Sequence, residues 1–312
     1  MKVFAPGKLV LTGAYAVLEG APAIVVATTR GALADSSRTA LSATQEVRAA
    51  IGDAPAPHVD ASSLFVGDRK LGLGASAAIL VASLGALEAD RGADLASEAV
   101  RASLLARARE AHAVAQSGGS GVDVAAAVHG GVLRYVMGEP PRHVALPPGT
   151  HLAVFACGTS ARTSELRASI DRLAEVDPAK HRACLDDLAA IARAADHAVA
   201  SADRDAFVDA VRRAARSLDR LGIASGAGLV PVGFEELERL AAREGAAFCV
   251  SGAGGGDVAV YVGSAAPSKP LLDRAHALGL FLLDVNVDEK GVRVVSAAPA
   301  FAGSHAGSAP AR

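Results

Sequence analysis

The sequence contains no tryptophan, and aromatic residues make up only 4% of its 312 residues. Hydrophobic residues nevertheless account for 51% of the chain. The buried core must therefore consist mainly of Ala, Val and Leu. A chain of this length can form two domains of ordinary size and bury a large core.

The chain also lacks an excess of charge, since 31 basic and 33 acidic residues leave a net charge of −2. This balance argues against a nucleic-acid binder that depends on electrostatics. No run of about 18 uncharged apolar residues suggests a membrane span. The N-terminal sequence MKVFAPGKLVLTG does not resemble a signal peptide, because Pro6, Gly7 and Lys8 interrupt its apolar residues. We expect neither nucleic acid nor a membrane as a partner.

Cysteine is scarce, and the three residues Cys157, Cys184 and Cys249 are far apart and have no metal-binding spacing. We expect reduced, buried thiols and hence a cytoplasmic protein.

In the first half, the pattern predicts strands at residues 3–5 and 9–11, joined by a turn at Pro6-Gly7-Lys8 that directs Lys8 outwards. Residues 31–66 are weakly patterned and predict edge strands and a hairpin, with a loop near residues 54–58. Further strands are expected at residues 23–28, 64–66 and 132–136, and helices at residues 76–89, 95–115 and 122–128. The proline-rich residues 138–148 are expected to connect the two halves.

The second half predicts a strand, a run of helices, two strands, a helix and further strands, which is an α+β arrangement. The expected helices are residues 164–175, 178–201, 204–221, 232–244 and 268–278, and the expected strands are residues 151–157, 246–250, 257–262, 281–287 and 292–296. We predict domains at residues 1–149 and 150–302 and a disordered tail at residues 303–312.

Glycine-rich segments mark the candidate site. In KLGLGASAAILV at residues 70–81, Gly72 and Gly74 precede a strongly helix-prone run that begins at Ala75. The unpaired N–H groups and the dipole of a helix start suit a phosphate, which Ser76 could also reach. The alternative is a glycine-rich turn before a buried helix. A dinucleotide fingerprint is a weaker interpretation, since it would need Asp94 as its distant acidic residue.

Three further segments could complete a phosphoryl-transfer site. Pro6-Gly7-Lys8 supplies a cation, Gly118–Asp123 a carboxylate, and Ser251–Gly256 a second glycine-rich loop. Lys8 could equally be a solvated turn residue. The alternative for Asp123 is an ordinary acid that stabilises a helix N-terminus.

Together these segments resemble the motifs of the GHMP kinases. KVFAPGKLVLTGAYA at residues 2–16 resembles their first motif, residues 70–78 their second and residues 251–257 their third. Within that superfamily the chain is most similar to the phosphomevalonate kinases. The features that carry this narrower similarity are Lys70 before the glycine loop, Ala111-His112 with Gln116, residues 120–125, GTSARTSEL at residues 158–166, and Asp257 after three glycines.

The resemblance implies a two-domain α+β GHMP kinase fold, with an N-terminal ribosomal S5-like α/β domain and a C-terminal ferredoxin-like α+β domain. It implies ATP-dependent phosphorylation of 5-phosphomevalonate, a phosphorylated small molecule, with ATP and Mg²⁺ as cofactors. Mevalonate kinase, another GHMP small-molecule kinase and a non-catalytic binding protein are the alternatives. The sequence does not indicate an oligomeric state.

The resemblance also implies roles for particular residues. Asp123 would be the catalytic carboxylate, Lys8 its cationic partner and Ser76 the Mg²⁺ ligand. The residues expected to bind the nucleotide are Lys70, Gly72, Leu73, Gly74, Ala75 and Ser76. The residues expected to bind the acceptor are Ser120, Gly121, Arg162, Ser251, Gly252, Ala253, Gly254, Gly255, Gly256 and Asp257. Arg162 could equally be a solvated surface residue.

The chain departs from the family pattern at three positions. Ala14 stands where the first motif usually has Glu, and Ala75-Ser76 replaces a Ser-Ser pair. His112 lies where mevalonate kinases carry a Glu that reaches Mg²⁺, with Glu110 near it. The resemblance therefore leaves Ser76 as the expected protein ligand of the metal, helped by phosphates and water.

Overall fold

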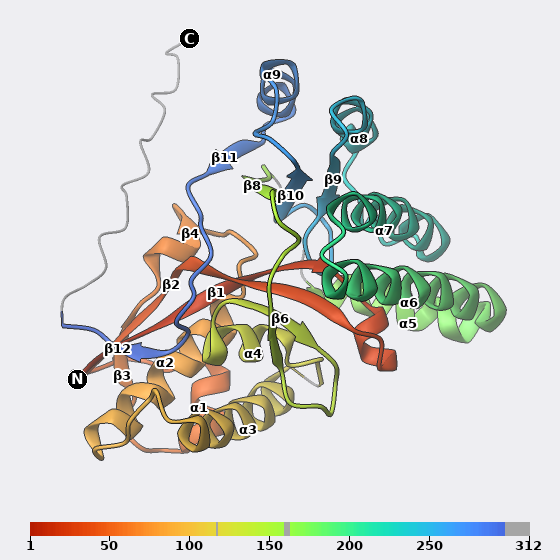
Figure 1. Cartoon of the computed structure of the whole chain (residues 1–312). Coiled ribbons are helices and arrows are strands. Elements are labelled where there is room, and N and C mark those ends of the chain that lie inside the picture. Colours follow the sequence, from red (N-terminus) through yellow and green to blue (C-terminus); the bar gives the residue numbers. More distant parts are fainter. Residues whose placement is uncertain (117, 159–162, 297–312) are drawn as a thin grey trace, which may run out of the picture.

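A computed structural model describes residues 1–116, 118–158 and 163–296 of the chain (Figure 1). Its α-helices are α1 (Gln45–Ile51), α2 (Ala75–Asp90), α3 (Glu98–Ala115), α4 (Val122–His129), α5 (Thr163–Val176), α6 (Pro178–Ala200), α7 (Arg204–Ser225), α8 (Phe234–Arg243) and α9 (Lys269–Ala277). Short 3₁₀ helices are η1 (Ala16–Glu19) and η2 (Ser62–Leu64). In these described ranges, every helix is too short or too polar to cross a membrane.

The strands form two main sheets and a small hairpin. The first sheet contains β1 (Lys2–Thr12), β2 (Ala23–Thr39), β3 (Pro57–Asp60), β6 (Val132–Tyr135), β7 (Arg142–Val144) and β12 (Arg293–Val294). The second contains β8 (His151–Ala156), β9 (Ala247–Val250), β10 (Val258–Gly263) and β11 (Phe281–Leu283). The hairpin pairs β4 (Phe65–Val66) with β5 (Arg69–Lys70).

The first sheet has the order β12-β1-β2-β6-β7, with β3 paired to β2. Helix α2 packs on β1 and β2, as expected for a helix that is apolar nearly all round. Helix α4 also packs on β1. The starts of both helices are therefore positioned by the same central strand.

The turn predicted at Pro6-Gly7-Lys8 is wrong, because β1 runs unbroken from Lys2 to Thr12. The ladder with β2 instead shifts register between Pro6 and Gly7. Such an irregularity accommodates proline inside a strand, since proline cannot donate to a regular ladder. Lys8 therefore lies on a central strand of the sheet.

The weakly patterned residues 31–66 also differ from the prediction. The strand predicted at residues 23–28 continues as β2 to Thr39, and helix α1 follows it. Thr44 caps α1 by accepting a hydrogen bond from the N–H of Val47 at 3.3 Å, and Gly52 ends the helix. Most of the predicted strand at residues 64–66 survives as β4 of the small hairpin. The predicted connection at residues 138–148 contains the short strand β7.

The second sheet has the order β11-β8-β10-β9, and α7 packs against β9 while α6 packs against α7. The helices and strands predicted in this half are present, although the strands predicted at residues 281–287 and 292–296 are shortened to β11 and β12. The chain then returns to the first sheet, where β12 pairs with β1. The division into residues 1–149 and 150–302 stays a prediction, and residues 303–312 lie outside the described part.

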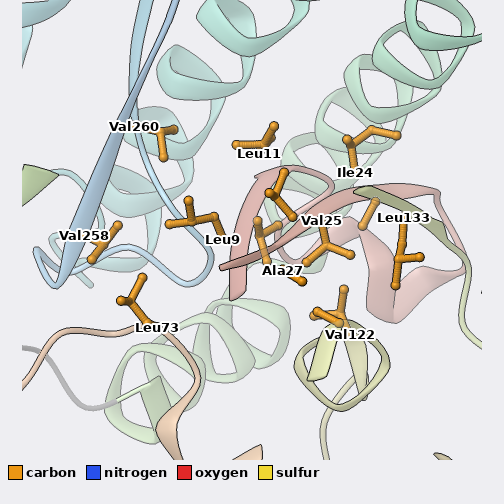
Figure 2. Packing of buried hydrophobic residues seen from close by; sticks show 14 of the residues in the cluster. Leu9, Leu11, Ile24, Val25, Ala27, Leu73, Val122, Leu133, Val258 and Val260 are labelled. Carbon is orange, nitrogen blue, oxygen red and sulfur yellow. The ribbon is translucent and has the colours of Figure 1, made fainter. Parts of the chain in front are cut away.

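The core is built from small aliphatic residues, as the composition predicts. Figure 2 shows Leu9 of β1 in one buried cluster with Leu73 and with Val258 of β10. Of the cysteines, Cys157 and Cys249 are buried, whereas Cys184 is only half-buried, and all three are free thiols. Because this cluster includes residues of both sheets, the buried side chains of β1 pack against residues from both halves of the chain.

Candidate active site

The loop at residues 72–74 leads into α2 as the sequence predicts. Gly72 and Gly74 have φ angles of +71° and +76°, which glycine adopts without a steric penalty. Gly74 is the N-cap of α2, and Ala75 is its first residue. The side chain of Leu73 is fully buried, so it anchors the loop in the core. The first N–H groups of a 16-residue helix thus open at this loop.

The first motif binds this loop through both the main chain and the side chain of Lys8. The N–H of Lys8 donates to the carbonyl of Leu73 at 2.8 Å. A Cβ atom at Gly7 would lie 2.5 Å from the same carbonyl, so only glycine permits this approach. The Nζ atom of Lys8 donates to the carbonyl of Gly72 at 3.2 Å. The irregularity in β1 therefore fixes Lys8 against the phosphate loop.

The third motif is tied to the first by side-chain hydrogen bonds. The Oγ atom of Ser251 accepts from the N–H of Val10 at 3.0 Å and lies 3.2 Å from its carbonyl, to which it donates. The hydroxyl of Tyr15 donates to the carbonyl of Ala253 at 2.7 Å. Burial raises the pKa of Tyr15, so this donor stays protonated. Ala14 is half-buried and lines a small cavity beside Gly252.

The glycines of the third motif allow a tight loop. Gly254, Gly255 and Gly256 have φ angles of +81°, +78° and +95°. The N–H of Gly255 donates to the carbonyl of Leu229 at 2.7 Å. A Cβ atom at Gly252 would lie 3.3 Å from the Nζ atom of Lys8. The loop therefore reaches the same ammonium group as the phosphate loop.

Two carboxylates flank Lys8. Burial lowers the pKa of Lys8, whereas the charges of Asp123 and Asp257 act in the opposite direction. A Cβ atom at Gly72 would lie 2.3 Å from the Cβ atom of Asp257, so the second and third motifs touch there. The buried Oδ1 atom of Asp257 has no hydrogen-bond partner within the described part of the chain. This carboxylate oxygen is therefore a buried acceptor without a donor among the described residues.

Asp123 lies in the first turn of α4, which begins after Gly121 at φ +74°. Its Oδ1 atom accepts from the N–H of Val124 at 3.0 Å, and its Oδ2 atom lies 3.5 Å from Nε2 of His112. A Cβ atom at Gly74 would lie 3.5 Å from that of Asp123 and 3.0 Å from Cγ of Lys8. The structure thus brings together four segments that are distant in sequence.

The loop before Asp123 is held by side chains that the sequence did not single out. The hydroxyl of Tyr135 donates to the carbonyl of Ser120. A Cβ atom at Gly121 would lie 3.0 Å from the Nε atom of Arg109. Ser120 itself accepts from the N–H of Val122 at 3.4 Å. Arg109 therefore lies beside Gly121, one of the residues expected to bind the acceptor.

The comparisons with known proteins agree with this geometry. No protein-family profile matches the chain. A phosphomevalonate kinase of Streptomyces sp. (strain CL190) is 29% identical over 67% of this chain and 62% of its own length. A mevalonate kinase of Aeropyrum pernix is 36% identical over 50% of this chain and 47% of its own length. The chain thus spans less than two thirds of either curated relative.

A solved structure covers nearly the whole chain. Streptococcus pneumoniae phosphomevalonate kinase, in complex with phosphomevalonate and AMPPNP, matches with a TM-score of 0.76 and 19% identity over 92% of this chain and 99% of its own. The chain has the GHMP kinase fold. The resemblance and the two-domain α+β class expected from the motifs are thereby confirmed.

For two residues expected to bind ligands, the structure describes no contact in this GHMP-type site. Lys70 is exposed at the end of β5. Arg162 lies outside the described residues. The roles of the other expected residues stay predictions, although their positions around Lys8 agree with them.

The structure adds a polar network around Ser76 that sequence reasoning missed. The Nε2 atom of Gln116 is 3.1 Å from Oγ of Ser76 and 3.0 Å from Oε1 of Glu46. The Nε2 atom of His112 is 3.2 Å from the same Oγ atom. Arg109 and His112 lie on α3 and Gln116 caps its C-terminus, and their spacing of three and four residues places them on one face, which was the available signal.

The GHMP fold family implies a divalent metal, and the described residues fit that group poorly. They contain no cluster of three or more His, Cys, Asp or Glu side chains that could hold a metal ion. The one expected ligand, Ser76, already contacts two nitrogen atoms. His112, in place of a carboxylate, faces Asp123. We therefore derive no catalytic step through a metal bound to these side chains.

Proposed function

We propose that the chain is a kinase that transfers the γ-phosphoryl group of ATP to the phosphate of 5-phosphomevalonate, giving mevalonate 5-diphosphate. The 29% identity to a phosphomevalonate kinase supports this choice. The likeness to a solved phosphomevalonate kinase in complex with phosphomevalonate and AMPPNP also supports it.

The position of Lys8 is the observation that carries the proposal. Its ammonium group is 3.2 Å from the carbonyl of Gly72 in the phosphate loop. It is also 3.3 Å from where a Cβ atom of Gly252 would lie in the third motif. A cation between two glycine-rich loops suits two phosphates, one from the nucleotide and one from the acceptor.

The chemistry needs little proton transfer. An oxygen of the acceptor phosphate attacks the γ-phosphorus, the bond to the bridging oxygen between the β- and γ-phosphates breaks, and ADP leaves with that electron pair. A phosphate acceptor has little or no proton to lose at neutral pH. Asp123 is held at both carboxylate oxygens by Val124 and His112, so it positions and balances charge while Lys8 offsets the phosphates.

The positions of the other loops suggest which of them would bind the nucleotide and which the acceptor. The N–H groups at the start of α2, from Ala75 onwards, would hold nucleotide phosphates together with Gly72 and Gly74. The loop at Ser120 and Gly121 and the third motif from Ser251 to Asp257 would hold the acceptor. Arg109 would add positive charge beside that loop.

Mevalonate phosphorylation is the second candidate, because the mevalonate kinase relative is 36% identical over its shorter match. A binding protein without activity is a third possibility, suggested by Ala14 in place of the usual Glu. The presence of Lys8, Ser76 and Asp123 together argues against it.

An assay of ADP release with mevalonate, phosphomevalonate and mevalonate diphosphate separates these functions. We expect turnover with phosphomevalonate. Turnover of mevalonate alone would assign a mevalonate kinase, and release of CO₂ from the diphosphate would assign a decarboxylase. If the chain binds the nucleotide but releases no ADP with any of the three acceptors, it is a binding protein without kinase activity.

Two substitutions test the proposed mechanism. Lys8→Met should lower kcat by about 10²–10³-fold, the usual effect of removing a group that stabilises transition-state charge. Asp123→Asn should also lower kcat, and unchanged activity would contradict its role. Lys269→Met and Asp273→Asn are matched controls, because these residues form an exposed ion pair on α9.

A further inference from the structure

The hydrogen-bond directions around Ser76 can be followed from Glu46. A carboxylate only accepts hydrogen bonds, so the atom of Gln116 that lies 3.0 Å from Oε1 of Glu46 must be its amide nitrogen. Burial opposes ionisation of Glu46, but hydrogen bonds from Gln116 and from main-chain and Thr44 groups leave its pKa below the ordinary value. The second hydrogen of the Gln116 amide then points to Oγ of Ser76, at 3.1 Å.

The directions can also be followed from Asp123. His112 is buried, with 5% of its surface exposed, so its ring nitrogen has little access to water. Its Nε2 atom lies 3.5 Å from Oδ2 of Asp123 and 3.2 Å from Oγ of Ser76. Because the carboxylate only accepts, we assign the tautomer with its hydrogen on Nε2, and in that tautomer the hydrogen also faces Oγ of Ser76.

The count of donors and acceptors at Ser76 then leaves one group unused. A hydroxyl has one hydrogen and two lone pairs. With that tautomer, the N–H groups of Gln116 and His112 occupy both lone pairs, so the hydroxyl hydrogen points elsewhere. Ser76 is the second residue of α2, where the helix presents its free N–H groups.

We propose that Ser76 donates its hydroxyl hydrogen to a phosphate oxygen of the bound nucleotide and is not a metal ligand. Glu46, Gln116 and His112 are the positioning residues that impose this direction. The inference rests on the proposed function in taking the ligand to be a nucleotide. A divalent cation that accompanies the nucleotide would then be held by phosphate oxygens and water, as Mg²⁺ often is.

The affinity for ADP with and without metal tests this assignment. Titrations of wild type and Ser76→Ala are made in EDTA and in excess Mg²⁺. A lost hydrogen bond to a charged group weakens affinity by about 10-fold or more, and we expect the same factor in both conditions. A loss that appears only in Mg²⁺ would overturn the proposal, because a metal ligand matters only when the metal is present.

The chain offers a matched control on the same helix. Ser83 lies seven residues after Ser76 in α2, is buried, and its Oγ atom has no partner among the described residues. Ser83→Ala should leave the affinity for ADP unchanged in both conditions. An equal loss in Ser83→Ala would show that any small change in α2 weakens binding and would remove the support for Ser76.

Two variants of His112 test the positioning role. His112→Gln keeps an N–H donor and should preserve the ratio of ADP affinities in Mg²⁺ and EDTA. His112→Leu releases one lone pair of Ser76, so metal can reach it and the ratio should rise by at least about threefold. Equal ratios in the two variants would contradict the lone-pair account. Circular dichroism of each variant confirms that it is folded.

The outcomes separate this inference from the proposed function. If wild type binds ADP but turns over no acceptor, the kinase proposal fails while the role of Ser76 is still decided by the titrations. If wild type does not bind ADP in either condition, the role of Ser76 is wrong as well.

Discussion

The contact between Gly72 and Asp257 makes a strong prediction, because it joins the second and third motifs. Gly72→Ala would place a Cβ atom 2.3 Å from that of Asp257, well inside normal contact distance. It would also force an L-residue into a φ of +71°. The substitution therefore combines local backbone strain with a clash between two loops.

The two contributions can be separated in size. The positive φ costs about 1–2 kcal/mol, and overpacking a fixed contact costs about 1–3 kcal/mol more. For a chain of this size each kcal/mol lowers Tm by about 2 °C, so Tm should fall by about 4–10 °C. Displacement of the phosphate loop should also weaken ADP binding by at least about 10-fold.

Gly92→Ala is the matched control for the strain alone. Gly92 has a φ of +84°, and apart from its chain neighbours no atom of the described residues lies within 4 Å of its ideal Cβ position. Differential scanning calorimetry should show a Tm fall of about 2–4 °C, and titration should show unchanged ADP affinity. The reasoning would be refuted if Gly72→Ala and Gly92→Ala had the same effect on both Tm and affinity.

Three further predictions concern stability. Burial raises the pKa of Glu238 to about 7. Its contribution to stability is therefore complete below about pH 4.5 and is lost as pH rises to 7, so Glu238→Gln should raise Tm more at pH 8 than at pH 5. Burial, Arg101 and His143 lower the pKa of His129 to about 4. The free energy of unfolding should therefore fall as pH drops from 6.5 to 4, and urea titrations should show a smaller fall for His129→Gln. Ser251→Ala removes both hydrogen bonds to the main chain of Val10 and should cost about 1–3 kcal/mol in urea unfolding, whereas no measurable change would show that the motif contact is unimportant.

Local patterns in the sequence were sufficient for most of the helices and for the second sheet. Helix α2 was predictable because two glycines precede a long apolar run, and the predicted site segments do meet at Lys8. The turn at Pro6-Gly7 was wrong because turn-forming residues in a strand can also mark a ladder irregularity. Which of the two forms depends on the close approach of Leu73, which lies far away in sequence.

Other features depended on signals that were present but weak. Thr44 and Gly52 bracket α1 as a cap and a stop, yet the helix between them is short. The contact of Glu46 with Gln116 follows from the packing of α1 on α3, and no spacing in the sequence expresses that packing. The role of Asp257 as a neighbour of Gly72 likewise depends on how the third motif folds back.

The return of the chain to β1 has a consequence for biosynthesis. Val3 of β1 pairs with Val294 of β12, and the N–H of Val295 donates to the carbonyl of Lys2 at 2.9 Å. At about 5–20 residues per second, a ribosome would make β12 roughly 15–60 seconds after β1. During that interval one edge of the nascent sheet has no strand to pair with, and an unpaired edge is a site for aggregation or chaperone binding. Strand β1 thus completes its pairing long after it has itself been synthesised.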